Sequence, residues 1–348
     1  MRVQIGDRKV GGGEACFIVA EMGINHNGQI EIAKEMIDKA VKCGVDAVKF
    51  QAFKTEEFVS DKKQIYVYKA RGKEITESMY EMFKRCEFSA EDFKELFGYC
   101  KQKKILCFAT PQNVSDLEML LRIGIPAIKV GSDDLTNLPL LRSYAAHRLP
   151  MIISTGMATL GEIEEGINTI KLTGNKKLVV LHCTSSYPPF PEEINLNKIR
   201  SIHQAFPVIV GFSDHARGII ASLGAIMLGA KVLEKHFTLD RNMIGPDHWF
   251  SADPKELKEL VQGVRILEKM MGSPVIGPTP REKQERKIAR RSIVATRDIG
   301  KGEKIVYKII VYKRPGTGLL PKFTDLVIGR KANCIIKTGE LITLEKLE

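Results

Sequence analysis

Short apolar segments alternate with longer amphipathic segments through residues 15–270 of the chain. The apolar segments have the length of buried strands, and the amphipathic segments repeat their apolar residues at helical spacing. Strands that alternate with helices predict parallel βαβ units. The predicted strands cover residues 15–23, 46–53, 105–111, 127–132, 150–157, 178–188, 207–215 and 231–240. The clearest helical patterns cover residues 30–44, 91–104, 114–124, 162–174 and 216–230.

Eight units over residues 15–270 match the roughly 250 residues of a closed (β/α)₈ barrel, so an α/β TIM barrel is the predicted fold. A doubly wound open sheet is the alternative, which is disfavoured because no Gly-rich dinucleotide-binding segment follows the first strand. The barrel domain is predicted to span residues 1–272. Residues 273–291 contain three prolines and a charged run and are predicted to be a linker. Residues 292–348 are rich in short β segments and turns, which predicts a small β-clip-like module.

The composition is that of an ordinary globular protein, with 44% hydrophobic and 27% charged residues. No apolar run approaches the ~20 residues that span a bilayer, and the amino-terminal segment lacks the apolar centre of a signal peptide. The seven cysteines are scattered and form no CxxC pair, which is typical of reduced thiols. We therefore expect a cytoplasmic protein without a membrane partner.

The net charge of +11 permits two interpretations, nucleic-acid binding or attraction of anionic small molecules. The densest basic run covers residues 280–291, where acidic residues are interspersed and a solvated linker is predicted. We expect no nucleic-acid partner. A binding protein that uses its C-terminal module to hold carbohydrate or nucleic acid remains a competing hypothesis from a different functional class.

Two histidines lie near the ends of consecutive predicted strands, His215 in residues 207–215 and His236 in residues 231–240. Neighbouring parallel strands end at the same edge of a sheet, so both imidazoles are expected at one mouth of the barrel. Histidine is the commonest metal ligand among side chains. The pair therefore suggests a metal site with open positions for substrate oxygens. Two partly buried histidines bonded to backbone carbonyls are the alternative.

Lys49 and Lys129 lie inside apolar predicted strands, where an unpaired charge is costly to bury. With the hydroxyl groups at neighbouring strand ends they suit a phosphate or carboxylate ligand. Each lysine could instead pair with a nearby carboxylate, or one could form a Schiff base in a metal-free aldolase. The other polar residues at or just after predicted strand ends include Glu21, Gln51, Thr110, Ser132, Asp134, Ser154, Ser185, Tyr187, Ser213, Glu234 and Asp247.

These strand-end segments together resemble the sialic acid synthase family, which comprises N-acetylneuraminate synthases and their relatives that make legionaminic and pseudaminic acids. The segments that carry the resemblance are IVAEMGINHNG (18–28), VKFQAF (48–53), KVGSDDLTNLPLL (129–141), STGMATLGEIEE (154–165), LHCTSSYP (181–188), GFSDHARG (211–218), EKHFTLDRNMIGPDH (234–248) and KRPGTGL (313–319). The resemblance implies a TIM barrel followed by an antifreeze-like (SAF) domain. It also implies condensation of phosphoenolpyruvate with an N-acylated hexosamine by C–O cleavage, with Mn²⁺ or Mg²⁺ as cofactor.

The resemblance further implies a role for each matching residue. His215 and His236 would hold the metal, and Glu21 and Asp134 would assist proton transfer or orient water. Asp134 stands where many bacterial relatives have Glu. The residues expected to bind phosphoenolpyruvate are Lys49, Thr110, Lys129, Ser132, Ser154, Ser185 and Ser213. Those expected to bind the sugar are Gln51, Tyr187, Asp247 and Arg314.

Two further implications concern the assembly and the sugar. In the family, the antifreeze-like domain of one subunit reaches over the partner's barrel, so a domain-exchanged homodimer is expected, with Arg314 touching the partner's sugar. N-acetylmannosamine is the expected sugar, which would give N-acetylneuraminate and phosphate. A 2,4-diacetamido-2,4,6-trideoxyhexose, the substrate of legionaminic or pseudaminic acid synthases, is the alternative.

Overall fold

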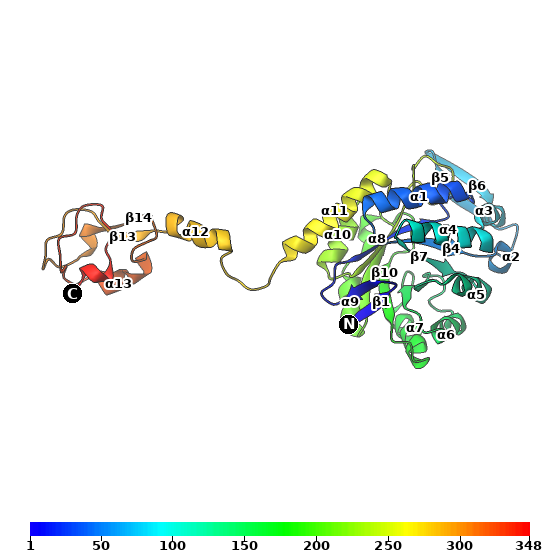
Figure 1. Ribbon diagram of the computed structural model, residues 1–348, viewed down its shortest axis with the longest axis horizontal. Helices are drawn as coiled ribbons and strands as arrows, with labels where there is room; N and C mark the ends of the chain where they lie inside the picture. Colours follow the sequence, from blue (N-terminus) through cyan, green and yellow to red (C-terminus); the bar gives the residue numbers. More distant parts are fainter. The chain divides into compact units, whose positions relative to one another are not determined.

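The computed structural model describes residues 1–348 and divides into two compact units, Met1–Met271 and Gly272–Glu348 (Figure 1). The first unit is built on eight parallel strands that close into a barrel, which confirms the predicted fold and excludes the open sheet. Around the barrel, the strands are β3 (Phe17–Gly23), β4 (Ala47–Ala52), β7 (Leu106–Pro111), β8 (Ile128–Val130), β9 (Met151–Ser154), β10 (Leu178–Cys183), β11 (Ile209–Asp214) and β12 (Val232–His236), with β12 pairing back to β3.

A helix follows each barrel strand, and these helices surround the sheet (Figure 1). They are α1 (Ile30–Cys43), α4 (Ala90–Gln102), α5 (Val114–Ile123), α6 (Leu138–Ala146), α7 (Leu160–Leu172), α9 (Lys198–Ala205), α10 (Ile220–Met227) and α11 (Pro254–Met271). A short additional helix, α8 (Pro191–Ile194), precedes α9. No helix in the structure is long and apolar enough to span a membrane.

Local sequence signals mark where these helices begin and end. Helix α4 starts after Ser89, which forms a reciprocal capping box with Asp92, and α7 starts after Thr159 with the same arrangement to Glu162. Each box satisfies backbone N–H groups that the helix itself leaves unpaired. Helix α1 ends at Gly44, whose φ of 84° is a left-handed conformation that glycine adopts without steric cost. These signals explain why the helix boundaries follow the amphipathic pattern closely.

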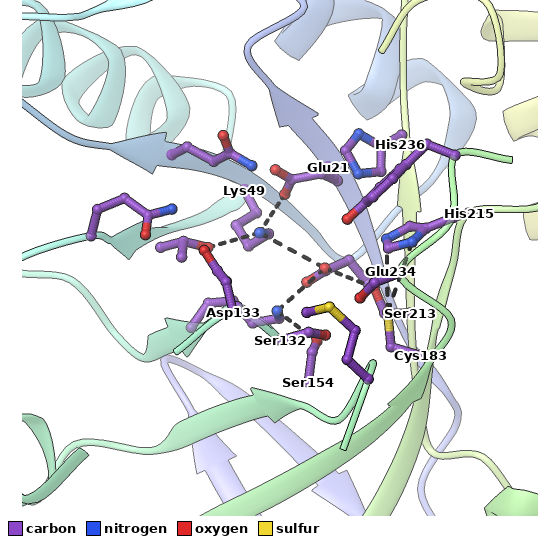
Figure 2. A pocket seen from close by; sticks show the side chains of 18 of the residues that line it. Glu21, Lys49, Ser132, Asp133, Ser154, Cys183, Ser213, His215, Glu234 and His236 are labelled. Atoms are coloured by element: carbon purple, nitrogen blue, oxygen red, sulfur yellow. Dashed lines mark hydrogen bonds and ion pairs between the residues drawn. The ribbon is translucent and has the colours of Figure 1, made fainter. Parts of the chain in front are cut away.

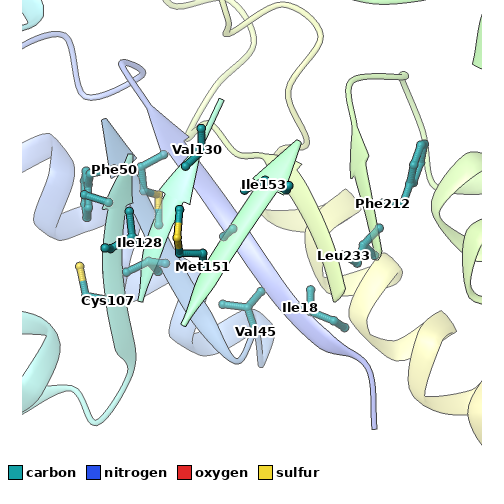
Figure 3. Packing of buried hydrophobic residues seen from close by; sticks show 14 of the residues in the cluster. Ile18, Val45, Phe50, Cys107, Ile128, Val130, Met151, Ile153, Phe212 and Leu233 are labelled. Atoms are coloured by element: carbon teal, nitrogen blue, oxygen red, sulfur yellow. The ribbon is translucent and has the colours of Figure 1, made fainter. Parts of the chain in front are cut away.

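The side chains of the barrel strands alternate between the helices and the barrel interior. Residues such as Ile18, Phe50, Ile153 and Leu233 point outward and form the main hydrophobic core with the helices (Figure 3). The strand residues that point inward at the amino-terminal end of the barrel are also apolar, and they form a second cluster. Because side chains alternate in a strand, one short segment can serve both clusters.

An amino-terminal hairpin closes the apolar end of the barrel. Its strands are β1 (Arg2–Ile5) and β2 (Arg8–Gly11), and its residues Val3, Ile5 and Val10 belong to the interior cluster. The other members of that cluster include residues near the beginnings of the barrel strands, such as Phe17 and Val232. The hairpin therefore fills the end of the barrel opposite the carboxyl-terminal ends of the strands.

The segment between β4 and α4 contains structure that the sequence pattern did not predict. It forms α2 (Thr55–Phe58), the antiparallel hairpin β5 (Ile65–Ala70) and β6 (Lys73–Ser78), and α3 (Met79–Cys86). Tyr68, Ala70, Met82 and Cys86 pack with Ile24 and Phe53, which follow β3 and β4. The insertion is thus attached at the carboxyl-terminal side of the barrel through its own small apolar cluster.

The second unit is small and rich in turns. Strands β13 (Ser292–Ala295) and β14 (Ile310–Lys313) pair antiparallel. The short helical element η1 (Tyr307–Ile309) lies between them, and η2 (Pro321–Phe323), α13 (Thr324–Val327) and η3 (Leu344–Lys346) follow β14. Isoleucines from several turns, including Ile293, Ile305 and Ile336, form its core. Residues 273–291, predicted to be a linker, contain helix α12 (Pro280–Ala289), all of whose residues are exposed.

Candidate active site

A cavity of about 360 Å³ opens at the carboxyl-terminal ends of the barrel strands (Figure 2). Along each strand the inward positions are apolar near the amino-terminal end and polar at the last one or two positions, so the polar groups meet at this mouth. The predicted site residues that line the cavity are Glu21, Lys49, Gln51, Thr110, Lys129, Ser132, Ser154, Ser185, Tyr187, Ser213, His215 and His236.

Lys49 is buried at the floor of this cavity and is paired with carboxylates. Its Nζ lies 2.8 Å from Glu21 Oε2 and 3.8 Å from Glu234 Oε1, and it donates a hydrogen bond to Thr110 Oγ1 at 2.8 Å. Burial lowers the pKa of Lys49, but the charges of Glu21 and Glu234 outweigh it and leave the pKa raised. Lys49 is therefore positively charged at neutral pH.

Lys129 lies on the other side of Glu234. Its Nζ donates to Ser154 Oγ at 2.8 Å and to the Val130 carbonyl at 3.0 Å, and it lies 3.6 Å from Glu234 Oε1. Burial lowers the pKa of Lys129, and Glu234 offsets only part of that effect. The cavity floor thus combines two lysines and their hydroxyl neighbours with Glu21 and Glu234, and each lysine lies within 4 Å of a carboxylate, as the alternative interpretation of the sequence expected.

Glu234, whose position in the sequence indicates a strand end but no role, also lines the cavity. Burial raises the pKa of this carboxyl, but Lys129 and Lys49 outweigh burial and hold the pKa below its ordinary value. Ser213 Oγ donates to Glu234 Oε1 at 3.2 Å, while Glu234 Oε2 has no hydrogen-bond partner. The signal in the sequence was its position two residues before His236, at an inward-pointing site.

The other carboxylate at the floor, Glu21, is almost completely buried on β3. Burial raises its pKa to about 7, although Lys49 acts in the opposite direction. A carboxyl group that titrates near neutrality can both accept and release a proton.

His215 and His236 face each other above this floor, with ring centroids 5.4 Å apart. His215 Nδ1 lies 2.8 Å from the Thr184 carbonyl oxygen, which can only accept, so Nδ1 carries the proton in this bond. His236 Nδ1 is buried without a hydrogen-bond partner and lies 3.6 Å from Asp247 Oδ2. The alternative that both histidines bond to backbone carbonyls thus holds for Nδ1 of His215 but does not account for His236 Nδ1.

Charge and burial keep His236 neutral. Burial lowers its pKa well below the ordinary value, and the positive charge of neighbouring groups, His215 first among them, lowers it further. Burial also lowers the pKa of His215, but the adjacent Cys183 outweighs it and raises that pKa. Cys183, whose Sγ lies 3.8 Å from His215 Nδ1, lines the cavity and was not identified from the sequence.

Asp134 does not line the cavity, although the sequence analysis gave it a catalytic role. Strand β8 ends at Val130, so the inward and outward alternation no longer applies at Asp134, four residues later. In the turn that follows, Asp134 Oδ1 accepts a hydrogen bond from Asn137 Nδ2 at 3.1 Å, and Asp133 lines the cavity instead. The structure therefore brings Asp133, not Asp134, to the other site residues.

Asp247 reaches the site from the loop after β12. It is not part of the cavity lining at the floor but lies beside His236, and burial raises its pKa to about 6. Ser251 Oγ donates to the Asp247 carbonyl at 2.6 Å, and Asn25 Nδ2 donates to Ser251 Oγ at 3.0 Å. Asn25 thus helps to hold this loop. Arg314 belongs to the second unit, where its side chain is exposed.

A closed barrel whose carboxyl-terminal mouth gathers lysines, carboxylates and a histidine pair is the arrangement of a (β/α)₈-barrel enzyme that acts on an anionic substrate. Residues 36–275 match the model of the NeuB family, and residues 290–348 match that of the SAF domain. The chain therefore belongs to the NeuB family of sialic-acid-type synthases, and the resemblance seen in the sequence is confirmed.

Individual relatives agree with this membership. The chain is 45% identical over 330 residues to an uncharacterized protein of Methanocaldococcus jannaschii, covering 95% of this chain and 94% of that protein. It is 40% identical over 328 residues to the N,N'-diacetyllegionaminic acid synthase of Campylobacter jejuni, covering 94% of this chain and 98% of that protein. The crystal structure of N-acetylneuraminic acid synthetase from Leptospira borgpetersenii in complex with citrate matches with a TM-score of 0.75 and 35% identity, over 82% of this chain and 95% of that one.

Proposed function

We propose that the protein condenses phosphoenolpyruvate with the open-chain aldehyde of an N-acylated hexosamine and releases phosphate. The observation that carries this proposal is the combination, within one cavity, of two buried lysines at the floor and a histidine pair above them. The floor suits an anionic co-substrate, and the histidines suit a group that activates a carbonyl. Membership of the NeuB family supports the same chemistry.

Lys49 and Lys129 are proposed to bind the anionic groups of phosphoenolpyruvate. Their ammonium groups would hold the phosphate and carboxylate of phosphoenolpyruvate, assisted by hydroxyl groups that already contact them, Thr110 and Ser154. The other hydroxyls proposed for this ligand are Ser132, Ser185 and Ser213. Gln51 and Tyr187 line the same cavity, and with Asp247 they are proposed to bind the sugar.

A divalent cation, Mn²⁺ or Mg²⁺, fits the histidine pair. His215 Nε2 is the ring nitrogen that the Thr184 carbonyl does not use, and His236 Nδ1 is a buried nitrogen without a partner, with the Asp247 carboxylate nearby. Neutral imidazole is the form of histidine that coordinates metals. When bound, such a cation supplies Lewis acidity to the carbonyl group of the sugar.

The remaining steps need proton transfer by the protein. Carbon C3 of phosphoenolpyruvate bonds to the aldehyde carbon, whose oxygen takes up a proton, and C2 becomes electron-deficient. Water then adds to C2 and loses one proton. As the C2–O bond to phosphate breaks, the new hydroxyl oxygen becomes the keto oxygen and its proton passes to the departing phosphate. Glu21, with a pKa of about 7, is suited to accept the proton of this water, and Asp133 is a further cavity carboxylate that could orient it.

N-acetylmannosamine is the sugar that we propose first. A 2,4-diacetamido-2,4,6-trideoxyhexose is a second candidate because Phe58 and Phe83 line the same cavity, with ring centroids 5.0 Å apart. An apolar wall of this kind would contact a C6 methyl group without leaving a hydroxyl group unpaired. The diacetyllegionaminic acid synthase among the relatives points in the same direction.

A substrate panel tests the proposal. The protein is incubated with phosphoenolpyruvate, Mn²⁺ and each sugar, and phosphate release and product mass are measured. We expect phosphate release with only one of the sugars. The product mass should equal that of phosphoenolpyruvate, the sugar and one water, less that of phosphoric acid. No release with any N-acylated hexosamine contradicts the proposal.

A Schiff-base aldolase would behave differently. Lys129 has the lowered pKa that such chemistry requires, but its Nζ donates to Ser154 and Val130 and faces Glu234, as an ammonium group does. Borohydride should therefore trap no pyruvate on the protein, and EDTA should remove activity. Trapping together with EDTA-resistant activity would favour the aldolase.

The domain-exchanged homodimer stays a prediction of the family resemblance. If Arg314 completes the partner's site, an inactive Arg314→Ala variant and an inactive His236→Ala variant should regain activity when mixed and allowed to exchange subunits. Each mixed dimer would contain one site with both residues intact. Absence of any recovery, with exchange verified by mass, contradicts the role of Arg314.

A further inference from the structure

A buried ion pair lies on the outer side of the barrel wall, directly behind the two histidines. Asp214 precedes His215 on β11, and Lys235 precedes His236 on β12. Their side chains point away from the cavity, are each about 1% exposed, and bring Lys235 Nζ to 3.0 Å from Asp214 Oδ2. Neither residue touches the cavity, so neither belongs to the site described above.

This pair coincides with the end of the hydrogen-bonded ladder between β11 and β12. Asp214 and Lys235 are the last partners in that parallel register. His236 is still held on its other side, because it pairs with Glu21 of β3. His215 lies one residue beyond the end of β11, where no strand ladder fixes its distance from His236.

A hydrogen-bond network around the ion pair constrains the position of His215 instead. Asp214 Oδ1 accepts from the Ala216 backbone N–H at 2.8 Å, and Asp214 Oδ2 accepts from Ser222 Oγ of α10 at 2.5 Å. Lys235 Nζ also donates to the Ala216 carbonyl. The residues on both sides of His215 are thus bonded to the residue that precedes His236, and the loop from 214 to 216 is fastened to β12.

Stability alone does not account for charged groups at this position. The neighbouring outward-pointing residues of the same strands, Phe212 and Leu233, are apolar and pack in the main core. Replacing a buried ion pair by apolar residues of similar volume is often neutral or stabilising. Directional bonds, by contrast, fix relative position in a way that apolar contacts do not.

We propose that Asp214 and Lys235 are positioning residues that set the spacing between His215 and His236 so that both can hold one divalent cation. This inference rests on the metal site of the proposed function. The ion pair on the outer side of the barrel wall would thus control the geometry of the metal site on the inner side.

The test compares Mn²⁺ binding with folding. The double variant Asp214→Leu/Lys235→Met removes both charges, and Asp46→Leu/Arg265→Met removes a matched partly buried ion pair, 2.7 Å long, at residues outside the cavity lining. Free Mn²⁺ is measured by electron paramagnetic resonance, without substrates, and the melting temperature is measured without metal. Changes to groups that orient metal ligands commonly cost 10–100-fold in affinity, so a loss of roughly tenfold or more is expected for the first variant alone.

The outcomes separate this inference from the proposed function. No Mn²⁺ binding by the unaltered protein contradicts the metal site itself. Binding by the unaltered protein and equal binding by a folded Asp214→Leu/Lys235→Met variant overturns the positioning role. If that variant fails to fold, Lys235→Arg keeps the charge and changes the geometry, and Ser222→Ala removes one bond to Asp214. Mn²⁺ affinity that is unchanged in both of these folded variants also overturns the role.

Discussion

Replacing Glu234 by Gln should destabilise the free protein while making it more responsive to anions. Glu234 Oε1 lies 3.8 Å from Lys49 Nζ and 3.6 Å from Lys129 Nζ, and all three side chains are buried. At an effective dielectric constant of about 20, each attraction is worth about 4 kcal/mol before desolvation is subtracted. Breaking a buried pair by removing one partner costs about 3–5 kcal/mol, which is the loss we expect.

Calorimetry in the absence and presence of inorganic phosphate or phosphoenolpyruvate measures this effect. A loss of that size corresponds to a melting temperature lower by roughly 10 °C for a domain of this length. Because Lys129 loses its nearest carboxylate in Glu234→Gln and Lys49 keeps only Glu21, either anion should raise the melting temperature of the variant more than that of the unaltered protein. Glu57→Gln, which removes an exposed carboxylate 3.0 Å from Lys54, is the control and should change neither quantity. Equal stabilisation of both proteins by phosphate would refute the reasoning.

Three further outcomes are expected. Asp133→Asn should reduce kcat/KM at least about tenfold and Asp134→Asn much less, because only Asp133 lines the cavity; equal losses would contradict this. Burial raises the pKa of Glu21 from its ordinary 4.5 to about 7, so its contribution to stability is complete below pH 4.5 and is lost as the pH rises towards 7. Denaturation in urea at several pH values should show a steeper decline in this range for the unaltered protein than for Glu21→Gln. EDTA should abolish activity and Mn²⁺ restore it, whereas His215→Ala and His236→Ala should not respond to Mn²⁺; activity that survives chelation would exclude the metal.

Periodicity was sufficient to predict the barrel because each strand is buried on both faces and each helix on one. The same argument located Lys49, Lys129 and His236, since these residues lie within regular strands. It failed for the hairpin of β5 and β6, where burial alternates along β5 but the exposed positions Ile65 and Val67, each more than half exposed, are apolar as well. A strand with apolar residues on both its exposed and its buried face gives no alternating hydrophobic signal.

Site residues that lie within regular strands could be predicted from the sequence pattern. Residues in the turns that follow the strands, and contacts between strands, could not. Asp133 and Asp134 are adjacent carboxylates in a turn, where no strand alternation indicates which one faces the cavity; in the structure Asp133 does, and Asp134 bonds to Asn137. Glu234 was visible at a strand end, but its role depends on two lysines from other strands meeting it. The partnership of Asp214 and Lys235 requires the pairing of β11 with β12, which sequence spacing does not specify.

The amino-terminal hairpin has a kinetic consequence. By filling one end of the barrel, it leaves reactants a single route through the opposite mouth. Lys49 and Lys129, at the floor, are 3% and 2% exposed, whereas Tyr187 at the rim is 46% exposed. If the sugar binds at the rim, as proposed, it would close this route, and we expect the anionic reactant to arrive first. Initial-rate measurements should accordingly follow a compulsory order of addition, with the sugar second.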